Sequence, residues 1–315
     1  MKTTNLFMAM AALSLAACSE NEVIDVNPDA HPAISLDVYT GVQTKGTETT
    51  TTTLKESNVG FGILAYKTAN AWSSSKTGAK PEFMYNEHVT WTSGVPAGSW
   101  GYPSAPLFWP SNTDKITFFA YAPYESAPGA DTDKKIILSA KTATGAPEIT
   151  FEVKTSNDWK DMVDLVVDGR TEIQDQTSTT TGTGSAGTVK FKFSHILTKI
   201  ADIKVKPDQT LGSNTKLYVT GLKLVPGSNT LQSKAIYKFD SDEWTATTTS
   251  ATYFSGDQDL SSFLNKATPS NWGYSTSSVD VSDHSSAASL FKTGEALYFI
   301  PVDNATGTGT KGALN

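Results

Sequence analysis

Short apolar segments alternate with polar turns along the chain, and this pattern predicts β-strands. Residues 34–39 (Ile-Ser-Leu-Asp-Val-Tyr) and 189–193 (Val-Lys-Phe-Lys-Phe) alternate apolar and polar side chains, which is typical of a half-buried strand. The one helix that we expect is a short one at residues 282–290. Further strands are expected at residues 59–66, 83–91, 116–121, 136–138, 149–153, 163–167, 201–205, 217–225, 235–239 and 295–300.

The composition points to the same all-β fold class. The chain has 44 Thr, 33 Ser and 23 Gly among 315 residues, which favours strands with polar outward faces joined by many turns. Residues 174–187 are dominated by Thr, Ser and Gly and read as a flexible connection. We therefore expect two consecutive β-sandwich domains, at residues 33–175 and 188–315.

The N-terminus has the features of a lipoprotein signal peptide. Lys2 is followed by an apolar run at residues 6–17, which is too short for a membrane-spanning helix of about 20 residues. The run ends in Leu-Ala-Ala17-Cys18, which resembles the bacterial lipobox, so we expect cleavage of residues 1–17 between Ala17 and Cys18 and lipidation of Cys18. An ordinary signal peptide with an incidental Cys is the alternative.

The segment after Cys18 reads as a tether between lipid and fold. Residues 18–32 are polar, contain two prolines and lack apolar periodicity. The acidic sequence Ser-Glu-Asn-Glu at residues 19–22 is similar to the tags that send lipoproteins to the outer face of the outer membrane in Bacteroidetes. We expect a surface-exposed protein, with a periplasm-facing anchor as the alternative.

Charge and motifs exclude several function classes. The net charge of −7 makes nucleic acid an unlikely partner in the absence of a basic excess. Four widely spaced His and one Cys give no metal-binding pattern, and no nucleophile elbow, phosphate loop or dinucleotide motif occurs. We expect no cofactor, no metal and no catalytic residue.

Two groups of polar residues were weighed as sites. Asp158, Asp161, Asp164 and Asp168 form the densest carboxylate cluster, and carboxylates serve both calcium binding and glycoside hydrolysis. Because the last two flank an apolar strand and no calcium-loop spacing is present, we favour a structural role. His195 follows an alternating strand without an acid placed near it by the sequence, so it too reads as structural.

An aromatic-rich segment supports a second functional hypothesis. Trp91, Trp100, Tyr102, Phe108 and Trp109 lie close together in sequence. On an exposed face such rings would stack on sugars, whereas in a core they would pack between strands. We favour core packing because the segment leads into the strand at 116–121. A monomeric carbohydrate-binding outer-membrane lipoprotein remains the alternative function.

Several segments, in order, resemble the fimbrillin-like (Mfa-like) proteins of Bacteroidales, which build type V fimbriae. The resemblance covers about residues 34–302 and implies two transthyretin-like β-sandwich domains and export as a lipoprotein. It also implies a non-enzymatic stalk or tip subunit of surface fimbriae, whose partners are other fimbrial subunits and a host or bacterial surface ligand. The segments that carry it are residues 61–66, 100–102, 108–110, 118–123, 164–167 and 191–200.

The resemblance also implies a maturation site. In that family a trypsin-like protease cuts after a basic residue that follows the first strand, and a strand from a neighbouring subunit fills the groove left behind. Lys45-Gly46 occupies the matching place, with Lys instead of the more usual Arg, which leaves the identity of the protease open. The alternative is that Lys45 is an ordinary loop residue of an unprocessed lipoprotein.

The C-terminal segment departs from the family pattern. The family continues into further strands after residues 296–301, whereas this sequence ends in a Gly- and Thr-rich segment at residues 307–315. We therefore expect the sequence to be truncated at this end.

Overall fold

The structure, a computed structural model, has an all-β fold, which confirms the fold class expected from the sequence. Within its described residues no helix has the length and apolar character needed to cross a membrane. The helices of the described residues are single turns: α1 (Thr51–Leu54), α2 (Trp72–Ser75) and the 3-10 turns η1 (Lys76–Gly78), η3 (Thr171–Ile173) and η4 (Ser261–Phe263). The structure describes residues 31–40, 49–94, 97–102, 107–110, 113–126, 136–153, 162–179, 187–227, 231–246, 252–254, 256–269 and 276–301.

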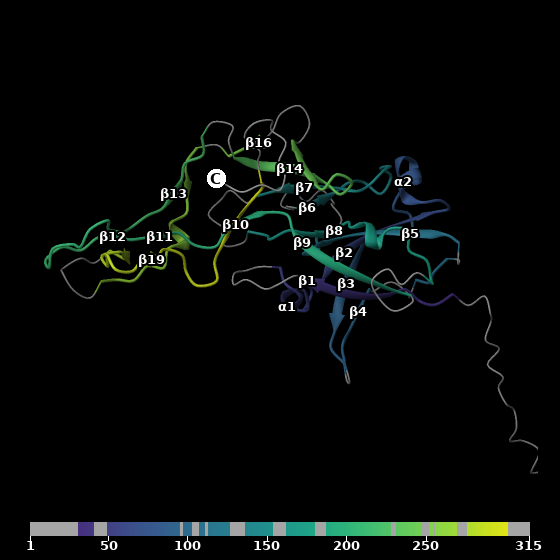
Figure 1. Cartoon of the computed structure of the whole chain (residues 1–315), viewed down its shortest axis with the longest axis horizontal. Coiled ribbons are helices and arrows are strands. Elements are labelled where there is room, and N and C mark those ends of the chain that lie inside the picture. Colours follow the sequence, from purple (N-terminus) through teal and green to yellow (C-terminus); the bar gives the residue numbers. More distant parts are fainter. Residues whose placement is uncertain are drawn as a thin grey trace, which may run out of the picture.

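Seven strands form the larger sheet (Figure 1). All neighbouring pairs are antiparallel except the first, in which the edge strand runs parallel to its partner. In spatial order the strands are β1 (Ser35–Thr40), β9 (Thr188–His195), β8 (Val166–Asp168), β5 (Lys115–Ala122), β2 (Phe61–Thr68), β3 (Met84–Thr92) and β4 (Ser99–Gly101).

Both faces of this sheet are covered at its centre. In β2 the side chains of Phe61, Ile63 and Ala65 enter one apolar core, and those of Leu64 and Tyr66 enter the other. Strand β5 divides its side chains in the same way. Strands buried on both faces have continuous apolar sequences instead of alternation, which explains the apolar runs at residues 61–66 and 116–122.

A second sheet packs over one face of the first. Its order is β15 (Glu243–Ala246), β14 (Gln232–Lys238), β7 (Glu148–Glu152) and β6 (Ile136–Leu138), with β16 (Thr252–Tyr253) also paired to β14. Phe119 of β5 and Phe239, which follows β14, meet between the two layers with ring centres 5.4 Å apart. The two sheets thus share one core.

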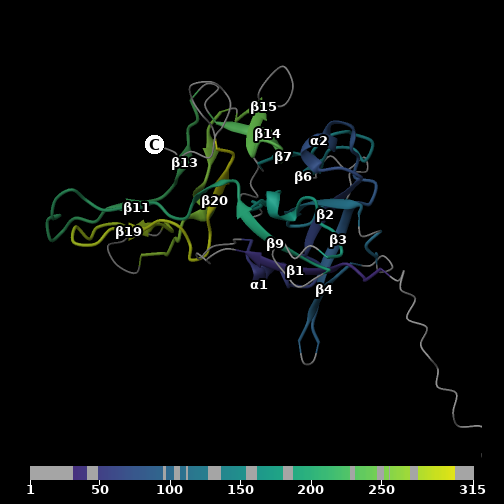
Figure 2. The same cartoon turned by 45° about the vertical axis from the view of Figure 1, so that its right-hand side comes forward.

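The remaining strands form four antiparallel ribbons of two strands each. Three of these ribbons form an arm, β11–β13 paired with β17–β19, which extends away from the large sheets (Figures 1 and 2). The pairs are β10 (Thr198–Ile200) with β20 (Leu297–Phe299), β11 (Lys204–Val205) with β19 (Ala288–Ser289), β12 (Tyr218–Val219) with β18 (Val279–Asp280), and β13 (Lys223–Leu224) with β17 (Gln258–Asp259).

Strand pairing crosses the segment that the sequence places between two domains. Strand β9 lies beyond residues 176–187 and pairs with β1 and β8, which precede them. Likewise β7 pairs with β14. The domain division at residues 175 and 188 stays a prediction, and both large sheets contain strands from either side of it.

The prediction of a helix at residues 282–290 is wrong. Residues 288–289 instead form β19, which pairs with β11. Nearby, the Asp283 carboxylate accepts a hydrogen bond from the Ser285 amide at 2.8 Å. This local side-chain bond offers the backbone a turn in place of a helical turn.

Candidate functional site: the first strand and its attachments

Strand β1 lies at the edge of the larger sheet, and β9 is its one partner among the described strands, from Ser35 opposite Thr188 to Thr40 opposite Phe193. The side chains of Leu36 and Val38 are 8% and 7% exposed, whereas Asp37 and Tyr39 face solvent. The alternation predicted for residues 34–39 is therefore confirmed. One row of β1 side chains enters the core and the other remains outside.

The inward side chains of β1 cover an aromatic core. They share a cluster with Phe61, Trp100, Phe191 and Phe193, and the ring centre of Phe61 lies 5.3–5.6 Å from those of the other three. Strand β1 also lies against β4, at the opposite end of the strand order. The sheet therefore curls until its two ends meet at β1, which closes the core.

The chain before β1 is held by a neighbouring segment. The amide of Ile34 donates to the carbonyl of Leu107 at 2.9 Å, and the amide of Trp109 donates to the carbonyl of Pro32 at 3.1 Å. The indole N–H of Trp109 reaches the carbonyl of Gly187 at 3.3 Å, and that same carbonyl accepts from the amide of Ser35. These bonds fix where the strand begins.

The chain after β1 is held by a different set of bonds, which we call the Thr49 anchor. The amide of Thr49 donates to the Asp164 carboxylate at 2.8 Å, and the Thr49 hydroxyl donates to the Asp164 carbonyl at 2.6 Å. Nδ1 of His195 lies 2.9 Å from the same carboxylate, whose side chain is 1% exposed. The anchor does not involve any residue of β1.

Helix α1 extends this attachment into the core. Thr50 caps the helix: its hydroxyl accepts from the Thr53 amide, and the Thr53 hydroxyl accepts from the Thr50 amide. Reciprocal capping of this kind satisfies donors that the first helical turn leaves open. One turn later, Leu54 is fully buried in the core that β1 covers.

The residues predicted for export and maturation lie outside the described part of the chain. This applies to Ala17 and Cys18 of the signal and to Lys45 and Gly46 of the predicted cleavage site. The structure describes both flanks of the latter pair, up to residue 40 and from Thr49 onward.

The carboxylate cluster has a structural role where the structure describes it. Asp158 and Asp161 lie outside the described residues. Asp164 belongs to the Thr49 anchor, and Asp168 accepts from the Lys192 amide at 2.6 Å and from Nε of Arg170 at 2.9 Å. Among the described residues no group of three or more His, Cys, Asp or Glu side chains could hold a metal ion.

His195 has the structural role that we favoured, with an acid partner that the sequence did not suggest. Asp164 lies 31 positions earlier, and Thr49 lies 115 positions before Asp164. No local motif links these three residues. The ladder of β8 and β9 brings Asp164 beside His195, and Thr49 joins them through its bonds to Asp164. The sequence feature that could have indicated this contact is the position of Asp164 and His195, each close to the end of a strand.

The aromatic segment packs mainly into the core, as we favoured. Trp109 is 1% exposed, and Trp100 is buried against Phe61 and Trp91. Trp91 is half-buried with the Lys55 ammonium 4.0 Å from its ring centre. Phe108 is 53% exposed, but because Trp100 and Trp109 lie inside the protein, the segment does not present the row of exposed rings that sugar stacking would use.

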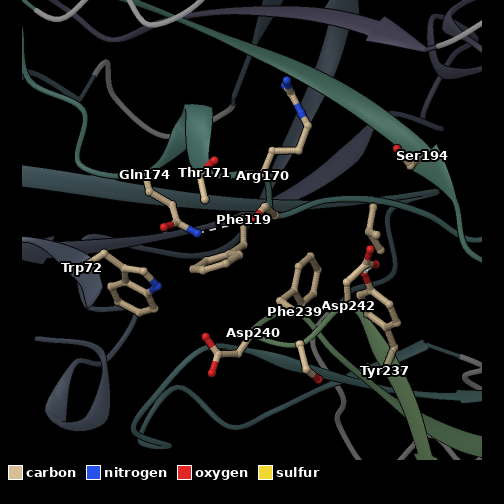
Figure 3. A pocket seen from close by; sticks show the side chains of 13 residues that line it. Trp72, Phe119, Arg170, Thr171, Gln174, Ser194, Tyr237, Phe239, Asp240 and Asp242 are labelled. Carbon is tan, nitrogen blue, oxygen red and sulfur yellow. Dashed lines mark hydrogen bonds between the residues drawn. The ribbon is translucent and has the colours of Figure 1, made fainter. Parts of the chain in front are cut away.

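A separate cavity of about 290 Å³ lies between the two large sheets, where β8 ends and β14 turns into β15 (Figure 3). At its wall, burial raises the pKa of Tyr237, and the hydrogen bond to Asp242 raises it further. The Tyr237 hydroxyl therefore stays protonated and donates to the Asp242 carboxylate. The sequence did not point to this cavity, since its lining residues come from five distant segments.

Comparisons with known proteins agree with one another. The family model described as fimbrillin-like matches residues 44–301. The fimbrium subunit Fim1C of Phocaeicola vulgatus is 59% identical over 315 residues, which is all of this chain and 80% of that protein. The crystal structure of a fimbrial protein from Bacteroides vulgatus ATCC 8482 has 59% identity and a TM-score of 0.77, covering 87% of this chain and 78% of that one.

Proposed function

Because the chain belongs to the fimbrillin-like family, we propose that it is a non-enzymatic structural subunit or adhesin of surface fimbriae, assembled by exchange of a strand between subunits. In this proposal, cleavage after Lys45 frees β1, and a strand from a neighbouring subunit takes its place. The observation that carries the proposal is the position of β1. It is the edge strand that closes an aromatic core.

The physical chemistry of this edge favours replacement by another strand. Loss of β1 would uncover apolar side chains and the backbone donors and acceptors of β9. Both are satisfied when an extended segment adds to the edge and inserts alternate side chains. The ladder between β1 and β9 is parallel, a pairing that is slightly less stable per residue than the antiparallel one.

The Thr49 anchor would keep the rest of the domain in place after cleavage. Because it joins Thr49 to Asp164 and His195 and not to β1, the strand can leave while α1 and the chain that follows remain attached. The predicted cleavage site lies between the anchor and β1.

The proposal includes export as a lipoprotein. Cleavage of the signal before Cys18 and acylation of that residue would tether the precursor to the outer membrane. Two or more acyl chains suffice for stable anchoring. Removal of residues 18–45 during maturation would then separate the subunit from its lipid, as incorporation into a fimbrium requires.

Limited trypsin digestion of protein expressed without residues 1–17 tests the maturation step. We expect mass spectrometry to show a new N-terminus at Gly46, and size-exclusion chromatography to show higher assemblies afterwards. A labelled peptide with the sequence of residues 32–41 should bind the cut protein and not the uncut protein. A reducing agent in every sample excludes disulfide dimers through Cys18.

Two controls make the result specific. The variant Lys45→Ala should remain uncut at this position and fail to bind the peptide. Lys55, the next basic residue, directly follows α1, and its backbone amide donates to the Thr52 carbonyl at 3.1 Å. Because this bond holds the backbone in place, we expect Lys55 to be cut later than Lys45. Resistance of Lys45 to trypsin, or cut protein that stays monomeric and takes up no peptide, would contradict the proposal.

A further inference from the structure

The cavity between the two sheets has walls from both of them. Phe119 of β5 and Phe239, whose ring centres are 5.4 Å apart, line it side by side, and Trp72 of α2 closes one end (Figure 3). The ring centres of Trp72 and Phe119 are 5.5 Å apart. With a volume of about 290 Å³, the cavity is at the small end of the range of ligand pockets, which begins at about 300 Å³. It has room for one small ring.

A hydrogen-bond donor of a buried residue faces this cavity. Trp72 is 3% exposed, and among the described residues its indole N–H has no hydrogen-bond partner. Figure 3 shows the indole nitrogen directed toward the hollow. Among the described residues the fully buried side-chain polar atom without a partner is Ser278 Oγ, so the Trp72 indole N–H is open to the hollow. In contrast, Nε1 of Trp244 donates to the Ile196 carbonyl at 2.9 Å.

Two further polar groups converge on the same space. Nε2 of Gln174 donates to the Gly169 carbonyl across a long 3.4 Å, which leaves the amide oxygen available as an acceptor. The Asp240 carboxylate lies at the opposite wall, where Nζ of Lys76 contacts its two oxygens at 2.7 and 2.8 Å. A carboxylate has about four acceptor sites, so Asp240 can accept further hydrogen bonds.

The charges around the cavity narrow the class of ligand. Asp240 and Asp242 in the lining disfavour an anion, because the guanidinium of Arg170, which also lines the cavity, is already paired with Asp168. A cation is disfavoured because the Asp240 carboxylate already pairs with Lys76. The Trp72 indole N–H is a donor and cannot accept a hydrogen bond from a cation. A neutral ligand with several hydroxyl groups can accept from the indole N–H and donate to the Gln174 and Asp240 oxygens.

We propose that this cavity binds a single monosaccharide unit. The sugar ring would lie beside Trp72, Phe119 and Phe239, which are 1–5% exposed, so hydrogen bonds would provide most of the specificity. A ligand of this size is expected to bind in about the millimolar range. The proposal uses the uncut chain and is independent of strand exchange.

The test follows the indole N–H signals of the intact, ¹⁵N-tryptophan-labelled protein by NMR. The probes are D-glucose, D-galactose, D-mannose and N-acetyl-D-glucosamine, each added in steps. We expect a saturable shift of the Trp72 signal, assigned with the variant Trp72→Phe, for at least one sugar. The signal of Trp244, whose donor is already bonded, is the internal reference and should not move.

A pair of variants tests the assignment of the cavity. Gln174→Leu removes one hydrogen-bonding group and should weaken binding roughly two- to tenfold. Trp91→Phe, in β3 and away from the cavity, should bind as the wild type does. A Trp72 signal that none of the four sugars shifts, or that shifts together with Trp244, would overturn the proposal, as would unchanged affinity in Gln174→Leu.

Discussion

Single buried polar residues hold distant parts of this fold together. Asp164 and Asp168 are 2% and 1% exposed, and each accepts hydrogen bonds from backbone amides and from a basic side chain. A buried carboxylate is tolerated when its acceptor sites are occupied in this way. Each aspartate therefore acts as a junction between segments.

The variant Asp164→Asn tests the Thr49 anchor. The Asn side chain keeps the shape of Asp but loses the negative charge, which attracts the Thr49 backbone N–H and the His195 ring. Hydrogen bonds to charged groups contribute about 1.5–3 kcal/mol, so we expect the free energy of unfolding to fall by about that amount in urea denaturation. His195→Gln should cost less because that side chain is 36% exposed. Equal stability of Asp164→Asn and wild type would show that the carboxylate bonds of the anchor contribute nothing.

Gly62 of β2 is required for close packing. A Cβ added there would lie 2.3 Å from Cε1 of Tyr121, whose hydroxyl is fixed by bonds to Asn86 and the Glu125 carbonyl at 2.7 and 2.8 Å. We expect Gly62→Ala to lower the free energy of unfolding by about 1–3 kcal/mol, as overpacking does. Gly101→Ala in β4 is the matched control, since nothing lies within 4 Å of its added Cβ. Similar urea midpoints for the two variants would refute this account.

At the scale of elements, the strands with long apolar or alternating sequences could be predicted and the ribbons of the arm could not. Strands β2, β5 and β9 carry continuous or alternating patterns over eight residues each. In contrast, β12 and β13 have two residues each, although the sequence predicted one strand at 217–225. Two residues are too few to show a period, so the pairing partner determines where such a strand forms.

The turns of the arm rely on ionised aspartates. The Asp259, Asp280 and Asp283 carboxylates accept from the amides of Ser261, Ser282 and Ser285. Hydrogen bonds from the following Ser hold the pKa of Asp259 and Asp283 below the usual value. Burial raises the pKa of Asp280. The hydrogen bonds from Ser282 and the charge of Lys216 outweigh this effect, so the net shift of the pKa is downward.

These shifts predict that acid weakens the arm. A carboxyl whose pKa is lower in the folded state stabilises that state above its unfolded pKa of about 3.9, and the contribution disappears as the pH falls through the folded pKa. We expect amide hydrogen exchange in β11–β13 to accelerate below about pH 4, relative to amides of β14. Constant relative protection from neutral to acidic pH would contradict the role of these turns.

At the scale of the whole molecule, one apolar layer joins the two large sheets. The ring of Phe119 packs against Tyr66, Trp72 and Phe239 at centre distances of 5.4–5.7 Å. Ladders also connect the two sides of the predicted domain boundary. The sequence could indicate the flexible connection, but it could not indicate pairing between strands separated by more than eighty positions.

Truncation of this layer should affect both sheets together. We expect Phe119→Ala to lower the free energy of unfolding by about 3–5 kcal/mol, and hydrogen exchange to accelerate in both β2 and β14. Val225→Ala is the control, because Val225 is 68% exposed and its truncation should have little effect. Faster exchange in β2 alone would show that the two sheets unfold separately.

The parallel pairing of β1 with β9 also sets an order of events for folding. The pair brings residue 35 beside residue 188, so a chain that emerges with its N-terminus first exposes β1 long before its partner is available. Contacts this distant in sequence form late, because the intervening loop must be closed first. The strand that we propose leaves the finished protein is therefore also among the last to be secured, and until then the nascent chain exposes both an apolar strand and its empty groove.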